Sequence, residues 1–263
     1  MSVEILTAGQ TVDLFLGGQI KICQPARGYR AAIDPVILAA SLDVKVGDRV
    51  LDVGAGHGTA AICLAHRAPD CTVVGIEIQS DLVKLANHNA SLNGFSSRVE
   101  VMAGDLMRPP VAVGLGDFDH VMANPPYLIC ENRKAAQEQV SSSSNFEGEA
   151  ALADWFEFML RMVCPKGIIT LIHRADRLDE LLSLMFRRVG EIVVFPLWPR
   201  YGVAAKRVLV SARKGVRTPM TVSAGLVMHE ESGNFTPVAE KILCGGSNPM
   251  GTPTKRDIRF HDL

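Results

Sequence analysis

Short apolar runs alternate with amphipathic segments through the centre of the chain. The segment 59–69 predicts a helix that ends at Pro69, and apolar positions at a spacing of about 3.6 residues predict a second helix from Ser80 to Asn93. Runs rich in β-branched residues flank these helices and predict strands at 48–54, 71–78, 98–105 and 117–124. Strands that alternate with helices in this way are typical of βαβ units, in which helices cover a mostly parallel sheet.

The alternation continues after a polar, Ser-rich stretch at 131–150, which has no period and predicts a long loop. Beyond this loop we expect a helix at 152–163, a strand at 167–173 and a helix at 176–189. Two strands follow, at 191–197 and 206–213. No helical pattern separates the last two strands. They are therefore expected to form an antiparallel hairpin at one sheet edge.

The segment before the first central strand predicts a short hairpin with a Gly-Gly turn and then a helix from about Asp34 to Ala40. The complete pattern predicts an α/β fold: a Rossmann-like, doubly wound, seven-stranded, mostly parallel sheet with one antiparallel edge strand and a short N-terminal hairpin and helix extension. We expect three parts along the chain: the hairpin and helix (1–45), the main domain (46–244) and a flexible tail at 245–263.

Composition and charge narrow the class of protein. With 263 residues, of which 48% are hydrophobic, the chain can build one large core. No apolar run approaches the roughly 18 residues of a membrane span and the N-terminus has no export signal, so we expect a cytoplasmic protein without a membrane partner. Six cysteines without metal-ligand spacing predict reduced thiols and no metal site. A net charge of -1 argues against nucleic-acid binding by bulk electrostatics, but it allows a local basic patch.

A glycine-rich turn joins the first central strand to the first helix. The stretch LDVGAGHGTAA places Gly54, Gly56 and Gly58 where a ligand can approach the backbone closely and meet the N–H groups of a helix N-terminus. Glu77 ends the second strand, where an acidic side chain can accept hydrogen bonds from both hydroxyls of a bound ribose. This order of strand, turn, helix and acid predicts a nucleotide-type cofactor.

Two cofactor classes fit this geometry, dinucleotides and S-adenosylmethionine. A dinucleotide site usually has GxGxxG, whereas the third glycine here comes one residue early. Asp52 precedes the turn and suits the methionine end of S-adenosylmethionine. Asp105, followed by Leu106, reaches the same sheet edge after the third strand and can accept a hydrogen from an adenine amine, which both cofactor classes carry. Capping of the following turn is the alternative role for Asp105.

The sequence NPPY follows the fourth strand as Asn124, Pro125, Pro126 and Tyr127. The prolines cannot donate to a strand ladder and they stiffen the backbone. The side-chain oxygen of Asn124 and the carbonyl of Pro125 would then be two acceptors aimed at one point, which matches an exocyclic NH2 group, while Tyr127 offers a flat stacking surface. Such acceptors expose the lone pair of the nitrogen and stabilise its positive charge, so the pattern predicts methyl transfer from a sulfonium to nitrogen.

The stretches LDVGAGHG, GIEI, AGD and NPPY, in this order, resemble the class I S-adenosylmethionine-dependent amino-methyltransferases over roughly residues 30–213. More narrowly, FLGGQIKICQPARGYRAAIDPVILAA, FEGEAALADW and the stretch from RKG to HEESGNFTPVAEKIL look like the tRNA adenine N6-methyltransferases that modify the purine next to the anticodon of a valine tRNA. This resemblance implies a tRNA partner and a methyl-acceptor site at Asn124, Pro125, Pro126 and Tyr127. It also implies a cofactor site made of Asp52, Gly54, Gly56, Glu77, Asp105, Leu106 and Asn124.

The resemblance implies further that the segment before the glycine turn folds over the cofactor. Tyr29, Arg30 and Asp34 are therefore candidates for a lid or substrate contact, with a structural hairpin and helix cap as the alternative. A basic cluster with interleaved aromatic residues offers an RNA-binding surface, in which Arg200 and Tyr201 are candidate substrate contacts. The other members of this cluster are Arg187, Arg188, Trp198, Lys206, Arg207, Arg213, Lys214 and Arg217.

Other activities share parts of the pattern. A protein glutamine N5-methyltransferase of the release-factor type uses NPPY on a planar amide but usually has an N-terminal helical domain, which the hairpin-like start of this chain does not resemble. An rRNA guanine N2-methyltransferase would meet the same donors. A nucleotide-binding module without catalysis leaves NPPY unexplained, and a dehydrogenase would bind a nicotinamide dinucleotide. The pattern predicts no particular oligomeric state.

Overall fold

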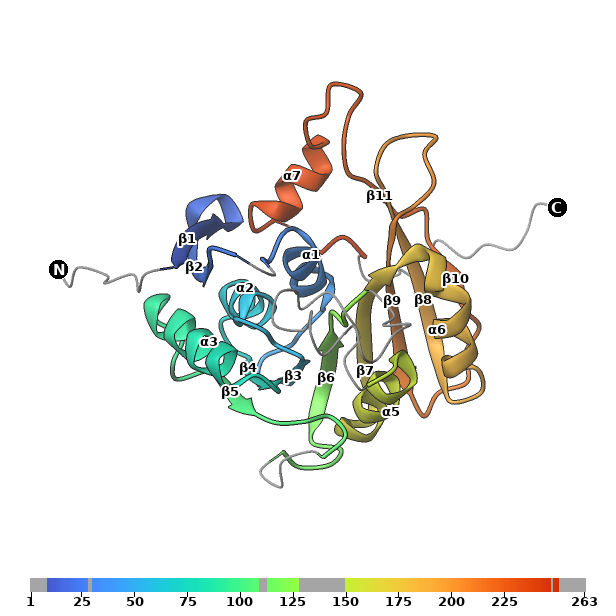
Figure 1. Ribbon diagram of the computed structural model, residues 1–263. Coiled ribbons are helices and arrows are strands. Elements are labelled where there is room, and N and C mark those ends of the chain that lie inside the picture. Colours follow the sequence, from blue (N-terminus) through green and yellow to red (C-terminus); the bar gives the residue numbers. More distant parts are fainter. Residues whose placement is uncertain (1–8, 28–29, 109–112, 128–149, 247, 251–263) are drawn as a thin grey trace, which may run out of the picture.

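The computed structural model describes residues 9–27, 30–108, 113–127, 150–246 and 248–250. They form one large sheet with helices on both faces and a separate two-stranded hairpin (Figure 1). The predicted α/β fold of the Rossmann-like type is therefore confirmed. The predicted loop at 131–150 and most of the predicted tail lie outside the described residues.

The sheet has the strand order β5, β4, β3, β6, β7, β9, β8, β10, and β11 also pairs with β8. All pairings are parallel except those of β9, which runs antiparallel to both β7 and β8. The strands are β3 (Arg49–Val53), β4 (Thr72–Glu77), β5 (Val99–Ala103), β6 (Phe118–Ala123), β7 (Val163–Arg174), β8 (Val189–Trp198), β9 (Arg207–Lys214), β10 (Thr221–Val222) and β11 (Leu226–Val227).

Two details of the predicted sheet are wrong. Over the described residues the sheet has nine strands instead of seven, because it includes β10 and β11, whose two residues each are too few to show a periodic pattern. The antiparallel strand β9 lies between β7 and β8 and not at the edge. Its residues Val208, Leu209 and Val210 are all buried, with neighbours on both faces of the sheet. A continuous apolar run of this kind is typical of an interior strand.

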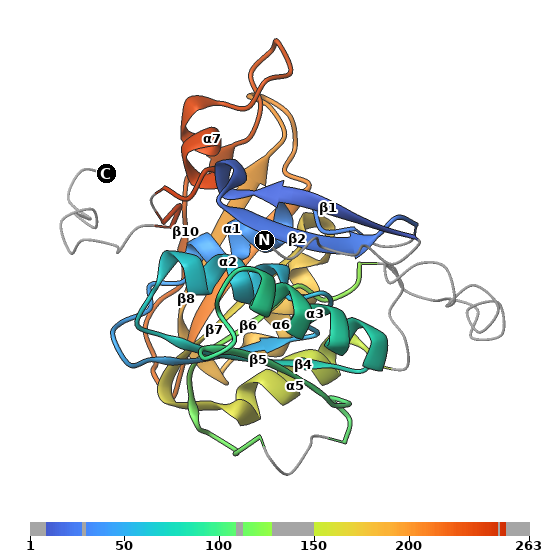
Figure 2. The same cartoon turned by 90° about the vertical axis from the view of Figure 1, so that its left-hand side faces the viewer.

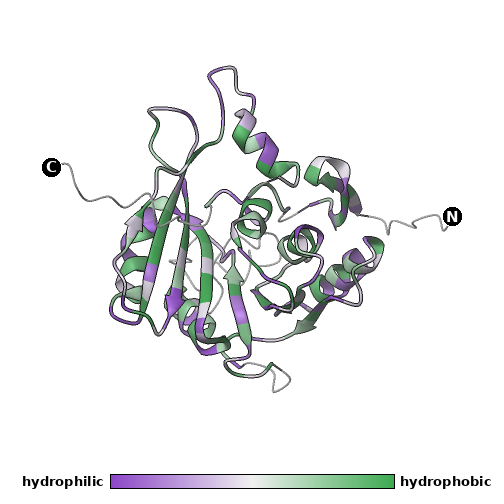
Figure 3. Ribbon diagram, turned by 180° about the vertical axis from the view of Figure 1, so that it is seen from behind, coloured by the Kyte–Doolittle hydropathy of each residue, from purple (hydrophilic) through white to green (hydrophobic). Residues whose placement is uncertain are grey.

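Helices cover the two faces of the sheet and enclose two apolar cores. One face carries α1 (Asp34–Ser41), α2 (Thr59–Arg67), α3 (Ser80–Leu92), α7 (Pro237–Leu243) and the hairpin of β1 (Gln10–Phe15) and β2 (Ile20–Pro25), and the other carries α5 (Leu152–Met162) and α6 (Leu178–Met185). Figure 2 shows the hairpin, α1 and α2 above the sheet and α5 below it. Successive residues of a strand enter opposite cores, as Val50 and Leu51 do. The strands accordingly carry long hydrophobic stretches (Figure 3).

The boundaries of the helices follow their sequence signals. Helix α2 ends at Arg67, before Pro69, and α3 is followed by Asn93 and by Gly94 in the left-handed conformation at φ 75°. Helix α6 ends at Met185, earlier than predicted, because the chain turns at Arg187 with φ 59° and enters β8.

Candidate functional site

The register of the sheet brings three chain segments together at its carboxyl edge. Val53, the last residue of β3, pairs with Ile76 of β4 and with Ala123 of β6. The glycine turn, Glu77 and Asn124 directly follow these paired residues, so they lie side by side at the ends of neighbouring strands. This edge is where open α/β sheets bind ligands, so the sequence-predicted grouping of these segments is confirmed in the fold.

Different features of the structure explain why the turn contains glycine at each position. Gly54, Gly56 and Gly58 all have left-handed φ values, of 70°, 56° and 82°. A β-carbon on Gly54 would lie 2.4 Å from Cη2 of Trp155 on α5, whereas one on Gly56 would meet no atom within 4 Å. Packing of the indole explains Gly54, and open space beside the backbone makes Gly56 the position that a ligand can approach.

Glu77 holds the glycine turn from the end of β4. Its carboxylate accepts hydrogen bonds from the Gly56 N–H at 3.0 Å and from the Gln79 N–H at 2.9 Å. The side chain is largely buried, and this burial raises the pKa of Glu77 although the backbone hydrogen bonds oppose the shift. The carboxylate is thus fixed at the predicted position, with lone pairs left to accept further hydrogen bonds.

Asp52 is a buried carboxylate directly below the turn. Burial raises its pKa from 3.8 to about 7, against a hydrogen bond from the Ala61 backbone, and the charge of Glu77 adds to the rise. Among the residues that the structure describes, its Oδ2 has no hydrogen-bond partner. A buried carboxylate oxygen left unsatisfied is costly unless a cation or donor arrives to meet it, so Asp52 has the environment of a ligand-binding residue.

Asp105 and Leu106 follow β5 at the same edge. Oδ1 of Asp105 accepts a hydrogen bond from the Met107 N–H at 2.8 Å, which is the turn cap that the sequence offered as its alternative role. Leu106 is half-buried against the core on the α5 side of the sheet. Both residues thus lie at the predicted sheet edge, and the hydrogen bond that Asp105 makes there caps a turn.

The NPPY segment leaves β6 beside the glycine turn and forms a polar cluster with two distant residues. The Tyr127 hydroxyl lies 2.6 Å from Oδ2 of Asp34 and 2.6 Å from Oδ1 of Asn124. Asp34 also accepts a hydrogen bond from Nε of Arg207 at 3.1 Å, and the Arg207 guanidinium lies 4.3 Å from the centre of the Tyr127 ring. Burial alone would lower the pKa of Arg207, but Asp34 and Tyr127 raise it above its usual value, so this residue stays charged.

His173, near the end of β7, packs its ring edge-on against Tyr127, with centroids 5.5 Å apart. The side chain is fully buried, and neither ring nitrogen has a hydrogen-bond partner within the described part of the chain. The pKa of His173 is lowered to about 4, first by burial and then by the positive charges of Arg177, Arg207 and Arg174. A neutral imidazole thus supports the tyrosine ring. Sequence reasoning missed His173, and its only signal was a polar residue within the buried run GIITLIH.

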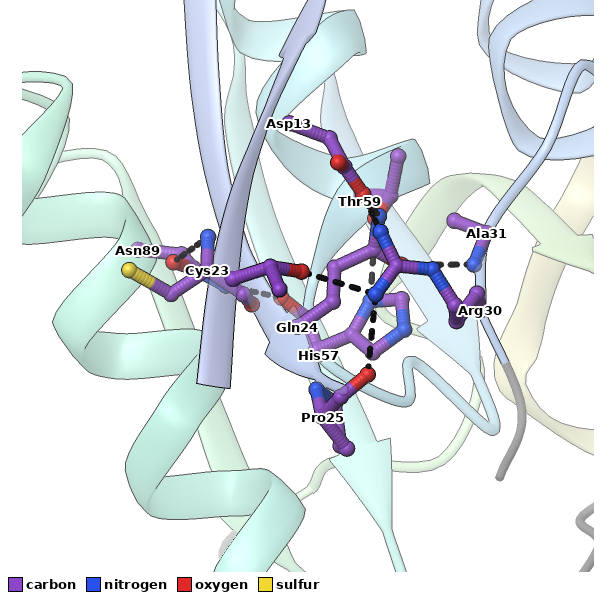
Figure 4. Close-up of polar contacts among 10 residues, drawn as sticks. Asp13, Cys23, Gln24, Pro25, Arg30, Ala31, His57, Thr59 and Asn89 are labelled. Carbon is purple, nitrogen blue, oxygen red and sulfur yellow. Dashed lines mark hydrogen bonds and ion pairs between the residues drawn. The ribbon is translucent and has the colours of Figure 1, made fainter. Parts of the chain in front are cut away.

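A second polar cluster fastens the N-terminal hairpin to the glycine turn (Figure 4). Asn89 of α3 is fully buried, donates to the carbonyls of His57 and Cys23, and accepts from the Cys23 N–H. His57 contacts Thr59 through Nδ1, and burial, with Arg30 as the second cause, lowers its pKa to about 4. Sequence reasoning missed Asn89, because an asparagine in an amphipathic helix has no distinctive spacing.

The candidate substrate residues lie in different surroundings. Arg30 donates to Thr11, to the Pro25 carbonyl and to Asp13, so its side chain holds the hairpin together, in line with the structural alternative. Arg200 and Tyr201 are exposed on the loop between β8 and β9, and Tyr201 is 93% exposed. Tyr29 lies outside the described residues.

The predicted basic cluster is divided between the two ends of the sheet. Arg200, Lys206 and Arg207 lie at or near the carboxyl end of β8, the edge that carries the candidate site. The remaining basic members lie at the opposite end of β8 and β9, or beyond it: Arg187, Arg188, Arg213, Lys214 and Arg217. The predicted cluster is therefore not one surface, because its two groups of basic residues are separated by the length of β8.

Within the described ranges, no helix is long and apolar enough to cross a bilayer. In the same part of the chain, no group of three or more His, Cys, Asp or Glu side chains is placed to hold a metal ion. Among the described cysteines, Cys63, Cys71, Cys164 and Cys244 are free thiols, while Cys130 lies outside these ranges.

Comparison with known proteins assigns the domain that contains this site. The family model described as a methyltransferase domain matches residues 44–188, more than half of the chain. A tRNA1(Val) (adenine(37)-N6)-methyltransferase of Porphyromonas gingivalis is 27% identical over 241 residues, covering 86% of this chain and 91% of the relative. A release factor glutamine methyltransferase of Chlorobaculum tepidum is 33% identical over 168 residues, covering 60% of this chain and 56% of the relative.

Solved structures agree on the fold. A predicted O-methyltransferase from Agrobacterium tumefaciens superposes with a TM-score of 0.69 at 28% identity, covering 81% of this chain and 97% of that one. An S-adenosylmethionine-dependent O-methyltransferase from Thermotoga maritima superposes with a TM-score of 0.52 at 20% identity, covering 72% of this chain and 68% of that one. The chain therefore belongs to the class I S-adenosylmethionine-dependent methyltransferases.

Proposed function

We propose that this methyltransferase methylates the exocyclic N6 amine of an adenine in tRNA, the anticodon-loop adenine of a valine tRNA. The observation that carries the proposal is the position of Asn124 beside the glycine turn, on neighbouring strands in which Val53 pairs with Ala123. A methyl donor at the turn and an amine at Asn124 would meet at one sheet edge, in the proximity that methyl transfer requires.

The residues at this edge fit S-adenosylmethionine. Asp52 offers an unpartnered buried oxygen to a cationic group, and Glu77 retains acceptor capacity for ribose hydroxyls. Gly56 leaves space beside the backbone. When bound there, the cofactor supplies a sulfonium-activated methyl group.

The NPPY segment would prepare the amine for attack. Asn124 Oδ1 and the Pro125 carbonyl accept the two amine hydrogens, and Tyr127 stacks on the adenine ring. Asn124 and the Pro125 carbonyl would thereby hold the nitrogen lone pair toward the methyl group, which S-adenosylmethionine bound at the glycine turn would supply. The positively charged nitrogen then loses a proton to water, so no buried general base is needed.

Two acceptors at one point favour a nitrogen nucleophile over oxygen. A hydroxyl group has one hydrogen and can satisfy only one of them, whereas an NH2 group satisfies both. The tRNA-modifying relative, which aligns over 86% of this chain, supports adenine in tRNA as the carrier of that group.

Glutamine methylation in a release factor is the second candidate, because a relative with that name is 33% identical over part of the chain. A primary amide also presents two hydrogens to the same acceptors. The match spans 56% of that relative, whereas the tRNA-modifying relative matches over 91% of its length.

Labelled S-adenosylmethionine, supplied with separate pools of unmodified tRNA, rRNA and release factor, tests the proposal. We expect label in tRNA alone, recovered as N6-methyladenosine after nucleoside digestion, and none with Asn124→Ala. Label in the release factor would favour the second candidate, and N2-methylguanosine in rRNA would refute adenine specificity.

A further inference from the structure

The Tyr127 hydroxyl has one hydrogen but lies 2.6 Å from two oxygen atoms, Oδ2 of Asp34 and Oδ1 of Asn124. Both distances are those of a strong hydrogen bond. A phenol cannot donate to both acceptors at once. One of the two contacts must therefore have the opposite polarity, with the phenol oxygen accepting.

The charge of the neighbours decides which contact is reversed. Asp34 is the stronger acceptor because hydrogen bonds to an ionised carboxylate are roughly twice as strong as those between neutral groups. The guanidinium of Arg207 donates to the same Asp34 oxygen through Nε at 3.1 Å, so Asp34 is part of an ion pair. The phenol hydrogen therefore goes to Asp34. The phenol oxygen keeps two lone pairs for donors.

Only one change makes Asn124 a donor toward the phenol. A carboxamide rotated by 180° occupies the same space with its oxygen and nitrogen exchanged. In this orientation Nδ2 of Asn124 donates to the phenol oxygen. The amide oxygen then points away from Tyr127, where it is available as an acceptor.

We propose that Asp34 is a positioning residue for methyl transfer: by taking the phenol hydrogen of Tyr127, it turns the amide oxygen of Asn124 toward the substrate amine. This inference rests on the proposed function, because it assigns the amine to Asn124. Without Asp34, the phenol donates to Oδ1 of Asn124 and the amide presents its NH2 group to the substrate. Two NH2 groups then face each other and the amine loses an acceptor.

Arg207 completes the arrangement from β9. Its guanidinium lies over the Tyr127 ring, 4.3 Å from the ring centre. Arg207, Tyr127 and Asp34 come from three separate parts of the chain and meet only in the folded protein.

Kinetics of Asp34→Ala test the proposal, with tRNA as substrate. We expect kcat to fall about 10- to 100-fold with little change in cofactor affinity, since a misplaced reacting group costs rates of this order. Asp34→Asn should lose part of the rate, because its neutral Oδ1 can still accept the phenol hydrogen but is no stronger an acceptor than the amide of Asn124. The matched control is Asp176→Ala, which breaks the exposed ion pair with Arg174 and should leave kcat unchanged.

A double-mutant cycle with Tyr127→Phe separates positioning from general structural damage. Because Asp34 acts through the phenol, Asp34→Ala should lower kcat in the wild-type background and have no further effect in the Tyr127→Phe background. An equal loss in both backgrounds would overturn the proposal, as would an unchanged kcat in Asp34→Ala.

An NMR measurement tests the arrangement independently of the substrate. The side-chain amide signal of Asn124, identified by its absence in Asn124→Ala, should shift in Asp34→Ala and stay in place in Asp176→Ala. An unchanged signal in Asp34→Ala contradicts the reorientation. If the wild-type protein methylates no tRNA while the signal shifts, the proposed substrate is wrong and the Asp34 arrangement stands.

Discussion

Gly54 lies against Trp155 so closely that a β-carbon on the glycine would come within 2.4 Å of Cη2 of the indole. The contact joins the glycine turn after β3 to α5 on the opposite side of the sheet. The first glycine of the turn is thus explained by packing, whereas a β-carbon on Gly56 would meet no described atom within 4 Å.

Gly54→Ala should destabilise the fold, whereas Gly56→Ala should mainly weaken cofactor binding. The first change combines a clash with a left-handed φ and should lower the free energy of unfolding by about 2–4 kcal/mol. The second adds only the conformational strain of about 1–2 kcal/mol, but its methyl group enters the space of the ligand. Urea denaturation and calorimetry with S-adenosylhomocysteine measure the two effects. Equal stability losses would contradict the distinction.

Asn124→Ala should keep the cofactor and lose the reaction. Removing the amide leaves the carbonyl of Pro125 as the single remaining acceptor for the amine. We expect kcat to fall by about 10²- to 10³-fold, the effect of deleting one preorganised polar group at a reacting centre. Single-turnover kinetics and cofactor calorimetry check both parts. Unchanged turnover would refute the role of Asn124.

Cofactor affinity should rise with pH up to about 7, because the pKa of Asp52 is raised to about 7 by burial. A cationic ligand favours the ionised form, so binding below pH 7 must release a proton. For the cofactor-free protein the sign is the reverse. A raised carboxyl pKa stabilises the fold fully below its ordinary value of 3.8, and this contribution is lost as the pH rises through about 7.

Calorimetry in buffers of different ionisation enthalpy measures the released proton directly. Asp52→Asn should bind the cofactor more weakly and show no proton release near pH 6. The same proton release in Asp52→Asn as in the wild type would assign the titration to another group.

Asn89→Ala should loosen the N-terminal hairpin selectively. The change removes three buried hydrogen bonds, with the Cys23 N–H and with the carbonyls of Cys23 and His57, at a cost of about 2–4 kcal/mol. Hydrogen exchange should therefore accelerate in β2 more than in β4. Asn87→Ala is the matched control, since Asn87 bonds the Val101 backbone of β5. Uniform acceleration would indicate global destabilisation.

Much of the candidate site followed from the sequence because parallel strands end at a common edge. This rule was enough to place Glu77 and Asn124 next to the glycine turn. The meeting of Asp34 with Arg207 was not predictable, because they are 173 residues apart and their contact depends on the insertion of β9 beside β7. Periodicity assigns a residue to a strand, but it does not say which strand becomes its neighbour.

The most direct measurement is mass spectrometry of the nucleosides of valine tRNA, transcribed without modifications and incubated with the protein and S-adenosylmethionine. The expected product is N6-methyladenosine, confined to the anticodon-loop adenine and absent when that adenine is replaced by guanine. A tRNA that gains no methyl group, in a reaction where the same protein methylates a release factor glutamine, would contradict the assignment.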